Sequence, residues 1–420
     1  MALTNGGIPA HGVPAEQVLA QLSALKEHDV RWRDGRAFTL AYYAGAEVGA
    51  LADEAYRRFS SDNGLNTDAF PSLKTIQNDV VGIVSGWLNG GEDAAGFMTS
   101  GGTESILLAV KAARERGRTE RSIEHPNVVL PDSAHAAFEK ACYYFGLQSR
   151  RIPVAADWRA DVVAMQAAID ADTVLIVGSA PQYPQGVIDP IEAIAGLGAA
   201  HDINVHVDAC MGGVTLTYLA TLGYPIPPWN FSVPGVTSIS VDLHKYGYTA
   251  KGASVLVHRN KRLRQYQTYV TTNWLGGMYG SSGIMGTKSG GPMAAAWAVM
   301  NHLGDDGYRR LTAAARTATE RLVAGVGTIP ELLVRAQPEA TIFSVGAVDP
   351  AQLDVFAVAD ALWRRGWYVD RQGPPPSLHL TVNAVHEDKI DEFLAILRSA
   401  VDEVLQSAKT GDQGAYGTVE

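Results

Sequence analysis

A lysine directly follows a histidine at the end of a predicted buried strand, in the segment SVDLHKYGYTAKG that begins at Ser240. Removal from water and nearby positive charge both lower the pKa of a lysine, and the neutral amine attacks carbonyl carbon. An ordinary solvated lysine would be unusual in this position. We therefore predict that Lys245 bonds covalently to a carbonyl group.

An aspartate ends an earlier predicted strand, in the segment HVDAC that begins at His206. In α/β sheets, ligands bind at the carboxyl ends of the strands. A carboxylate there can pair with the N–H of a pyridine ring and keep that ring protonated, so that it withdraws electrons. Asp208 is therefore a candidate partner for a ring nitrogen, although capping the following turn is an equally ordinary role for it.

Two further segments would suit a phosphorylated flat ring. MTSGGTES, from Met98, brings free backbone N–H groups and hydroxyls to a helix start, which favours an anion. Its candidate residues are Ser100, Gly101, Gly102 and Thr103, and it lacks the Gly-Lys-Ser/Thr ending of a nucleotide P-loop. In DSAHAAFEK, His135 could stack on a ring or donate a proton. Helix capping is the ordinary alternative for both segments, and for His135 so is an exposed position on the surface.

The order of these groups along the chain narrows the interpretation. A phosphate loop, a histidine, a strand-end aspartate and, 37 residues later, a lysine follow one another. Together they match the phosphate, ring and aldehyde of pyridoxal 5′-phosphate (PLP). We therefore predict a PLP enzyme in which Lys245 holds the cofactor as a Schiff base, and we propose no metal ligands.

The hydrophobic pattern predicts the elements that position these groups. Helices are expected over residues 47–59 and 70–88, followed by the alternation of short strands and helices that is typical of parallel α/β folds. The predicted strands are residues 127–131, 173–180, 204–209, 237–242 and 253–258, and the predicted helices are 103–116, 134–145 and 191–201. Continuous β-branched runs of this kind suit a sheet that is covered on both faces.

From about Gly291 the pattern changes to that of a smaller α+β domain. A long helix with one glycine-containing break is expected from Pro292 to about Val326. It is followed by strands over 340–348, 367–370 and 378–383 and by helices over 355–365 and 388–407. We divide the chain into an N-terminal arm (1–60), a large PLP-binding domain (61–305) and a small C-terminal domain (306–420). Residues 409–420 are predicted to be a loose tail.

Composition restricts the partners of the protein. The net charge is −10, and the sequence contains no basic run that could neutralise nucleic-acid phosphates. The cysteines, Cys142 and Cys210, are too few for a disulfide framework and suit a reducing compartment. The N-terminal segment lacks the pattern of a signal peptide, and no run of eighteen apolar residues occurs. We therefore expect a cytoplasmic enzyme with a small-molecule substrate and without stable membrane insertion.

Several longer segments resemble one branch of a known superfamily. They are TSGGTESILLAVKA, DSAHAAFEKACYYFG, PQYPQGVIDPI, VHVDACMGG, SISVDLHKYGYTAKGASVL, NWLGGMYGSSGIMG and AAAWAVMNHLGDDGY. They resemble the sphingosine-1-phosphate lyase branch of the fold-type I PLP enzymes, in a match that runs from about Tyr42 to Tyr308 and more loosely to His386. The group II amino-acid decarboxylases share the aspartate and the His-Lys segments.

The resemblance implies roles for individual residues. Lys245 would carry the cofactor with His244 beside it, Asp208 would hold the pyridine nitrogen, and His135 would stack on the ring. Ser100 to Thr103 would bind the cofactor phosphate. Tyr183, in PQYPQG, resembles a family aromatic residue near the reacting carbon.

The resemblance also implies a homodimer with shared active sites. The loop from Gly283 to Gly291 is the segment expected to reach the site of the partner subunit. Within this loop, Gly286 and Thr287 are expected to contact the cofactor.

The residues expected at a substrate phosphate match the family only in part. Tyr42 and Lys251 match its phosphate contacts, whereas Asn66 in NGLNTD stands where the family has histidine. In GTKSGG, Thr287 and Lys288 replace serine and arginine. Lysine meets a phosphate as a point charge, without the two-pronged fork of arginine. Whether the substrate carries a phosphate therefore stays open at this point.

Three functions are compatible with the sequence. The first is a carbon–carbon lyase that splits a phosphorylated sphingoid base, or a similar 2-amino-3-hydroxy compound, into an aldehyde and (phospho)ethanolamine by a retro-aldol cut. The second is an L-amino-acid decarboxylase, and the third is a catalytically silent binding protein. The strand PSLHLTVN favours the lyase, because His379 stands where decarboxylases of this fold generally place a carboxylate-binding arginine. The nearby Arg364, Arg365 and Arg371 keep the decarboxylase open, and the intact cofactor segments argue against a silent protein.

Overall fold

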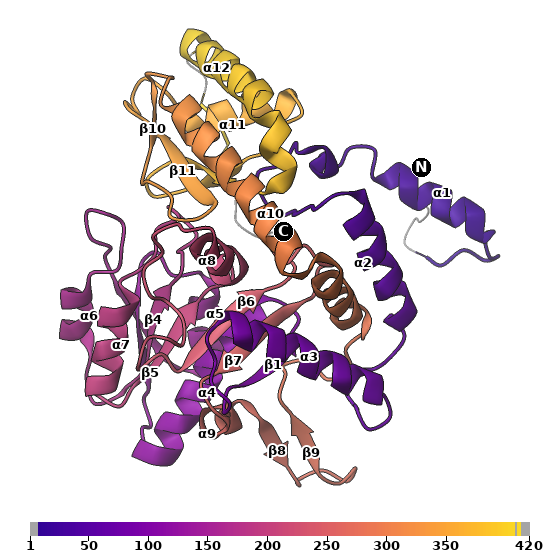
Figure 1. The fold of residues 1–420 in the computed structure, drawn as a ribbon, viewed down its shortest axis with the longest axis vertical. Coiled ribbons are helices and arrows are strands. Elements are labelled where there is room, and N and C mark those ends of the chain that lie inside the picture. Colours follow the sequence, from indigo (N-terminus) through magenta and orange to yellow (C-terminus); the bar gives the residue numbers. More distant parts are fainter. Residues whose placement is uncertain (1–6, 408–409, 413–420) are drawn as a thin grey trace.

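A central seven-stranded sheet organises the larger part of the molecule (Figure 1). The computed structural model describes residues 7–407 and 410–412, so the tail predicted for 409–420 lies almost wholly outside the described residues. The strand order is β1-β7-β6-β5-β4-β2-β3, in which β7 runs antiparallel to β1 and β6 and the other neighbours are parallel. The strands are β1 (Ala95–Thr99), β2 (Asn127–Pro131), β3 (Gln148–Ile152), β4 (Thr173–Ser179), β5 (Asn204–Asp208), β6 (Ser238–Asp242) and β7 (Ser254–His258). The predicted mostly parallel α/β fold is confirmed.

Helices cover both faces of this sheet, as the continuous apolar strands required. Along β2, Val128 and Leu130 pack into a core with Phe138, whereas Val129 between them packs on the opposite face with Ile194. The covering helices are α3 (Pro71–Trp87), α4 (Gly102–Arg121), α5 (Ala137–Phe145), α6 (Val162–Ala168), α7 (Ile191–Ala200) and α8 (Gly212–Thr221). Successive strand residues point to opposite faces, so a strand buried on both sides needs apolar residues at every position.

A second, four-stranded antiparallel sheet forms the smaller unit, in the order β10-β11-β13-β12. It contains β10 (Leu332–Val334), β11 (Ile342–Ala347), β12 (Asp370–Gln372) and β13 (Ser377–Thr381), with α11 (Val355–Arg364) and α12 (Ile390–Ser407). The strand predicted over 367–370 begins only at Asp370, because Tyr368 pairs with Ala37 of the N-terminal segment instead. The helix predicted from 388 begins at Ile390, after a 3-10 turn over Ala384–Lys389.

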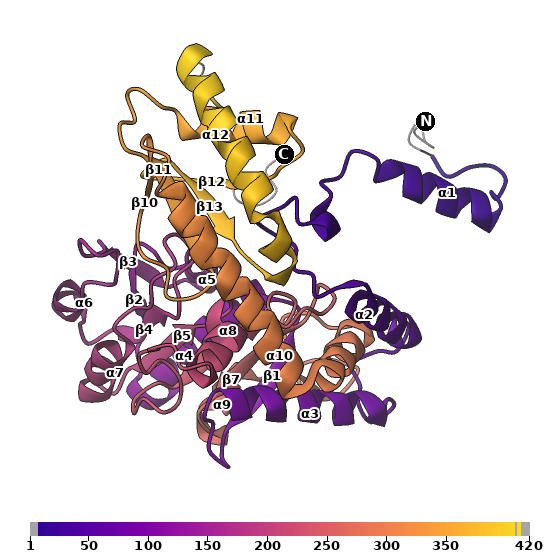
Figure 2. The same cartoon turned by 45° about the horizontal axis from the view of Figure 1, so that its top comes forward.

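One long helix, α10 (Gly291–Val326), joins the two units (Figure 2). The predicted glycine-containing break falls at Gly304, whose φ of 57° interrupts the helical backbone. Met300 lies in the core of the larger unit, whereas Leu322 lies in the core of the smaller one. We therefore propose that the boundary near residue 305 lies inside this helix, just beyond its break.

The N-terminal segment contacts both units: the smaller one before α2 (Ala46–Phe59) and the larger one within α2. Phe38 is buried in the smaller core, and Val48 is buried in the larger one, where α2 packs on α10. By contrast, α1 (Ala15–Leu25) extends away from the body in both views and contains no buried residue (Figures 1 and 2). Over residues 7–407 and 410–412, no helix is long and apolar enough to cross a membrane.

Candidate active site

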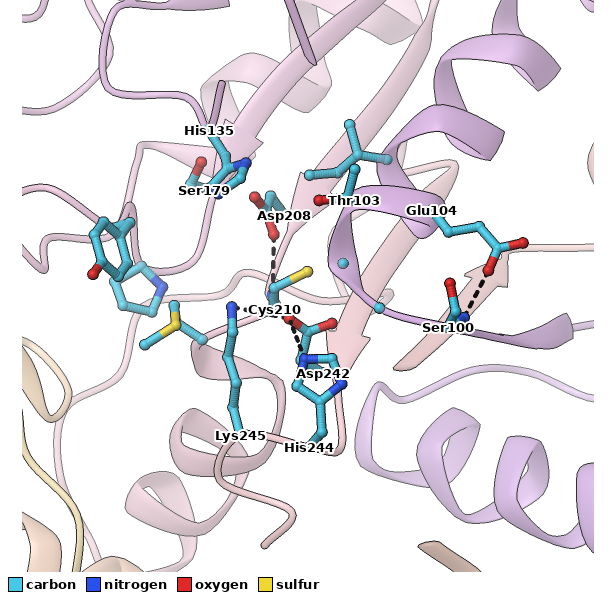
Figure 3. A pocket seen from close by; sticks show the side chains of 16 residues that line it. Ser100, Thr103, Glu104, His135, Ser179, Asp208, Cys210, Asp242, His244 and Lys245 are labelled. Carbon is cyan, nitrogen blue, oxygen red and sulfur yellow. Dashed lines mark hydrogen bonds and ion pairs between the residues drawn. The ribbon is translucent and has the colours of Figure 1, made fainter. Parts of the chain in front are cut away.

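A cavity of about 350 Å³ opens where three parallel strands end (Figure 3). Ser179, Asp208 and Asp242 are the last residues of β4, β5 and β6, and all three line it. Nine of the predicted site residues line the same cavity: Ser100, Gly101, Gly102, Thr103, His135, Tyr183, Asp208, His244 and Lys245. The fold thus brings together groups that are scattered over more than 140 residues of sequence.

Lys245 lies on the turn after β6 and is paired with a buried carboxylate. Its Nζ is 2.9 Å from Oδ2 of Asp242, and Nε2 of His244 is 3.7 Å from the same oxygen. Burial alone would raise the pKa of Asp242, but chiefly the charge of Lys245 holds it below its usual value. Burial also lowers the pKa of His244 to about 4, so this ring is neutral near pH 7.

Asp242 is a site residue that the sequence interpretation missed. It ends a strand three residues before Lys245, so the rule that identified Asp208 applied to it equally. Its carboxylate lies 2.9 Å from Nζ of Lys245 and so helps to position that amine in the cavity.

Asp208 caps a turn and also lines the cavity. Its Oδ1 accepts the N–H of Cys210 at 3.0 Å and the hydroxyl of Ser240 at 3.3 Å, so the carboxylate does cap the following turn. The same residue lines the cavity, because that turn ends a parallel strand. Burial raises the pKa of the Cys210 thiol well above its usual value, so this cysteine is a neutral wall residue.

The loop between β1 and α4 forms one side of the cavity. A methyl group at Gly102 would lie 2.8 Å from Sγ of Cys210 and 2.9 Å from Oδ2 of Asp242, so glycine is needed there. Glu104, which was also missed, accepts the N–H of Ser100 and the N–H of Ile284, each at 2.7 Å. Its carboxylate therefore joins this loop to the segment expected to reach a partner subunit.

These groups fit PLP. The start of the 20-residue helix α4 suits a phosphate, the carboxylate of Asp208 suits a ring nitrogen, and the amine of Lys245 suits an aldehyde. His135 is half-buried, and partial loss of water lowers its pKa. Its Nδ1 accepts the N–H of Ala137 at 3.1 Å, which leaves the ring proton on Nε2. A neutral imidazole of this kind can lie against a flat ring.

Tyr183 borders the cavity and is held by the smaller unit. Its ring stacks on His379 with centres 3.8 Å apart, and Nε2 of His379 donates to the Tyr183 carbonyl oxygen at 2.8 Å. Burial lowers the pKa of His379 to about 4, so this residue supplies no cation for a substrate carboxylate. The three nearby arginines bind carboxylates of the smaller unit: Arg364 and Arg365 bind Glu403, and Arg371 binds Asp360.

Two predicted phosphate ligands lie beside the cavity. Nζ of Lys251 donates to the carbonyl oxygen of His244 at 3.1 Å and lies 5.0 Å from the ring centre of Tyr42. The Tyr42 hydroxyl is 3.9 Å from Sδ of Met211, which lines the cavity. Partial loss of water, together with the charge of Lys245, lowers the pKa of Lys251 to about 8.

The remaining predicted residues do not line the cavity of their own chain. Asn66 is exposed, and its Oδ1 accepts the N–H groups of Asp68 and Ala69 in a local turn. Gly286 and Thr287 are also exposed. Lys288 lies 4.0 Å from the ring centre of Phe97 and donates to the carbonyl oxygen of Met98, just before the phosphate loop. Their predicted roles stay predictions.

The sheet topology and the cavity define the class of the protein. A fold-type I PLP-dependent enzyme has such a sheet, with a smaller C-terminal unit and a lysine, an aspartate and a phosphate loop at the strand ends. Residues 1–340 match the family model described as the pyridoxal-dependent decarboxylase conserved domain.

Curated relatives narrow the class to a family. A sphingosine-1-phosphate lyase of Oryza sativa is 40% identical over 405 residues, which cover 94% of this chain and 74% of the relative. Sphingosine-1-phosphate lyase 1 of Rattus norvegicus is 38% identical, and the match covers 98% of this chain and 73% of the relative. The chain therefore belongs to the sphingosine-1-phosphate lyase family, within the pyridoxal-dependent decarboxylases.

Solved structures agree with this assignment. The sphingosine-1-phosphate lyase of Burkholderia pseudomallei superposes with a TM-score of 0.91 at 37% identity, covering 96% of this chain and 94% of that chain. A glutamate decarboxylase of Lactobacillus brevis has a TM-score of 0.85 at 19% identity, covering 97% of this chain and 96% of that chain. The second likeness shows the shared fold alone.

Proposed function

We propose that this enzyme cleaves the Cα–Cβ bond of a phosphorylated 2-amino-3-hydroxy compound of the sphingoid-base class, releasing an aldehyde and phosphoethanolamine. The observation that carries the proposal is Lys251, whose ammonium lies beside Tyr42 at the edge of the PLP cavity. This position supports a role for the cation in binding a phosphate next to the reacting amine. Relatives named for cleavage of sphingosine-1-phosphate match this chain over nearly its whole length.

Each group of the chain has a defined task in this reaction. PLP, when bound, supplies the electron sink for the cleaved bond. Asp208 would pair with the ring nitrogen, His135 would lie against the ring, and Lys245 would hold the cofactor. Tyr42 and Lys251 bind the phosphate through charge-assisted hydrogen bonds. A base must also take the proton of the substrate β-hydroxyl.

The reaction type can be tested directly with a substrate panel. Purified enzyme loaded with PLP is incubated with phosphorylated and plain 2-amino-3-hydroxy compounds and with common L-amino acids. We expect aldehyde from the phosphorylated amino alcohols and no carbon dioxide from the amino acids. Carbon dioxide without aldehyde would show that the enzyme is a decarboxylase and not a lyase.

Replacing Lys251 by alanine should weaken binding of the phosphorylated substrate selectively. A hydrogen bond to a charged group is worth roughly 1.5–3 kcal/mol, so KM should rise by about tenfold or more. A non-phosphorylated analogue should be affected less than about twofold, because it lacks the charge that Lys251 meets. Steady-state kinetics on the two substrates measures the difference, with Lys261→Ala on the exposed helix α9 (Lys261–Arg264) as the matched control.

A similar loss on both substrates would contradict the phosphate role. Lys251 lies close enough to Lys245 for the two charges to interact. In that case, the charge of Lys251 would act on Lys245 and not on the substrate phosphate.

We also propose that the enzyme is a homodimer with shared active sites. Helix α1 exposes Leu19, Leu22 and Leu25 on a segment that extends from the body (Figures 1 and 2). Between β8 (Tyr269–Thr271) and β9 (Tyr279–Ser281), the connecting loop exposes Trp274, Leu275 and Met278, and the exposed Gly286 and Thr287 follow soon after. Clustered apolar surface of this kind is typical of a protein–protein interface, and a second copy of the chain is the proposed partner.

Mixed dimers would test the sharing of sites. Lys245→Ala and Thr287→Asp should each be inactive as pure proteins, because one loses the cofactor lysine and the other places a charge at the cofactor phosphate. If Thr287 serves the site of its partner, each mixed dimer has one intact site, and random mixing should restore about a quarter of the activity. Sedimentation measures the assembly. Absence of recovery in verified mixed dimers would mean that each chain builds its own site.

A further inference from the structure

A row of polar side chains runs along one face of two neighbouring strands and ends at the PLP cavity. In β5, His206 and Asp208 share a face, whereas Val207 between them packs in the apolar core on the other face. In β6, Ser238 lies opposite His206, and Ser240 lies opposite Asp208. His206 and Ser240 are both fully buried, at 0% exposure. A polar row inside a covered sheet requires an internal partner for each polar atom.

Hydrogen bonds join this row into a chain that ends on Asp208. Nδ1 of His206 is 2.9 Å from the Ser238 hydroxyl, and Nε2 of the same ring is 3.1 Å from the Ser240 hydroxyl. The Ser240 hydroxyl donates in turn to Oδ1 of Asp208 at 3.3 Å. Within residues 7–407 and 410–412, the hydrogen bonds to this carboxylate come from Ser240 and from the N–H of Cys210, and both end on Oδ1. Oδ2 is then the oxygen that can meet a ligand in the cavity that Asp208 lines.

The directions of the hydrogen bonds follow from the carboxylate at the end of the chain. An ionised carboxylate only accepts, so Ser240 donates its single proton to Asp208. The two lone pairs of the Ser240 oxygen then accept, one from Nε2–H of His206 and one from the thiol of Cys210 at 3.3 Å. Burial lowers the pKa of His206 to about 4, so this ring is neutral near pH 7. Its proton therefore lies on Nε2, and its Nδ1 accepts the hydroxyl proton of Ser238.

Resting on the role proposed for Asp208, we propose that His206 and Ser240 are positioning residues that hold this carboxylate toward the ring nitrogen of PLP. The N–H of His206 occupies one lone pair of the Ser240 oxygen and so directs the hydroxyl proton to Oδ1 of Asp208. With Oδ1 held, the carboxylate keeps one orientation and presents Oδ2 to the ring nitrogen. Neither His206 nor Ser240 is among the residues that line the described cavity, so both act through Asp208.

A cofactor analogue tests this positioning by binding alone, without turnover. 1-Deaza-PLP has a C–H group in place of the ring nitrogen, so it keeps the phosphate and the aldehyde but cannot pair with a carboxylate. The full-length enzyme, freed of cofactor, is titrated with PLP and with the analogue, and the ratio of the two Kd values measures the pairing. We expect Ser240→Ala to reduce the wild-type preference for PLP about fivefold, because a charge-assisted hydrogen bond no longer fixes the carboxylate.

Two amides of different length test the role of His206. His206→Gln brings an amide N–H near the position of Nε2, so it can still donate to Ser240 and should keep the preference for PLP within about twofold. His206→Asn places its amide near Nδ1, where it can meet Ser238 but not Ser240, and should reduce the preference about threefold. The matched control is His258→Gln, which replaces another buried histidine of the same sheet, whose Nε2 lies 3.0 Å from Oε1 of Gln267. This control should change Tm and leave the preference within about twofold.

Each contrary result identifies what has failed. If the Ser240 and His206 variants bind PLP and the analogue more weakly by the same factor, these residues only support the fold, and the proposal is overturned. If every variant keeps the preference, the positioning is overturned while the role of Asp208 stands. If His206→Asn keeps the preference and His206→Gln loses it, the direction of the chain is wrong, and the proposal is again overturned.

The wild-type enzyme itself tests the role on which the proposal rests. Equal affinity of the wild type for PLP and for 1-deaza-PLP would show that Asp208 does not pair with the ring nitrogen, and the positioning would fail with that role. The lyase function is measured separately, by aldehyde from the phosphorylated amino alcohols. A wild type that prefers PLP but forms no aldehyde would remove the lyase function and leave the positioning of Asp208 intact.

Discussion

Lys245→Ala should abolish turnover of every substrate while the chain still folds. We propose that this amine bonds to the cofactor aldehyde, and the neighbouring Lys251 is held by the carbonyl oxygen of His244. The variant also leaves the buried carboxylate of Asp242 without the amine 2.9 Å away, so Tm should fall. Circular dichroism would show that the secondary structure remains.

Borohydride reduction followed by peptide mapping identifies the attached residue. The cofactor label should appear on the peptide that contains Lys245, and it should be missing from Lys245→Ala. Lys251→Ala is the control, in which the label should stay on Lys245. A label on Lys251 in the wild type would overturn the assignment.

Asp208→Asn should lower kcat by about 100-fold or more and weaken cofactor binding much less. The amide oxygen can still accept the N–H of Cys210, so the turn after β5 should persist. An amide carries no charge with which to hold a proton on the ring nitrogen, and charge-assisted bonds contribute roughly 1.5–3 kcal/mol each. Steady-state kinetics and a cofactor titration measure the two effects separately.

A second buried aspartate provides the matched control for Asp208. Asp189 accepts the N–H groups of Ser179 and Ala160 at 2.8 and 2.9 Å, and burial raises its pKa to about 6. It is absent from the lining of the PLP cavity, so Asp189→Asn should change stability while kcat stays within about twofold. Full activity in Asp208→Asn would mean that Asp208 is only a turn cap.

Strand ends explain why much of the site could be predicted from the sequence. Asp208 and Lys245 could be predicted because apolar runs indicate buried strands. The carboxyl ends of such strands meet at one edge of a parallel sheet. Asp242 also ends a predicted strand, so the same rule applies to it, but the His-Lys pair that follows is the stronger signal in that segment. β1 was missed because its sequence AGFMT is short and contains glycine, and its antiparallel pairing with β7 has no local signature.

Other parts of the site depend on contacts that no local pattern encodes. Tyr183 and Asp370 are 187 residues apart, and only the packing of the smaller unit on the larger one joins them. Asn66 and Thr287 were assigned from the resemblance, and a single chain leaves both exposed. The shared site that we propose would be specified by an interface between subunits, which strand and helix periodicity does not describe.

Helix α10 has a consequence for how this protein loses its structure. Its first part is buried in the core of the larger unit and its last part in the core of the smaller one, so neither core can open without exposing one half of the same helix. Amide exchange in α10 should therefore occur mainly through global unfolding, with Gly304 as the point where protection is weakest. We therefore expect the two halves of α10, joined through Gly304, to couple the unfolding of the two cores.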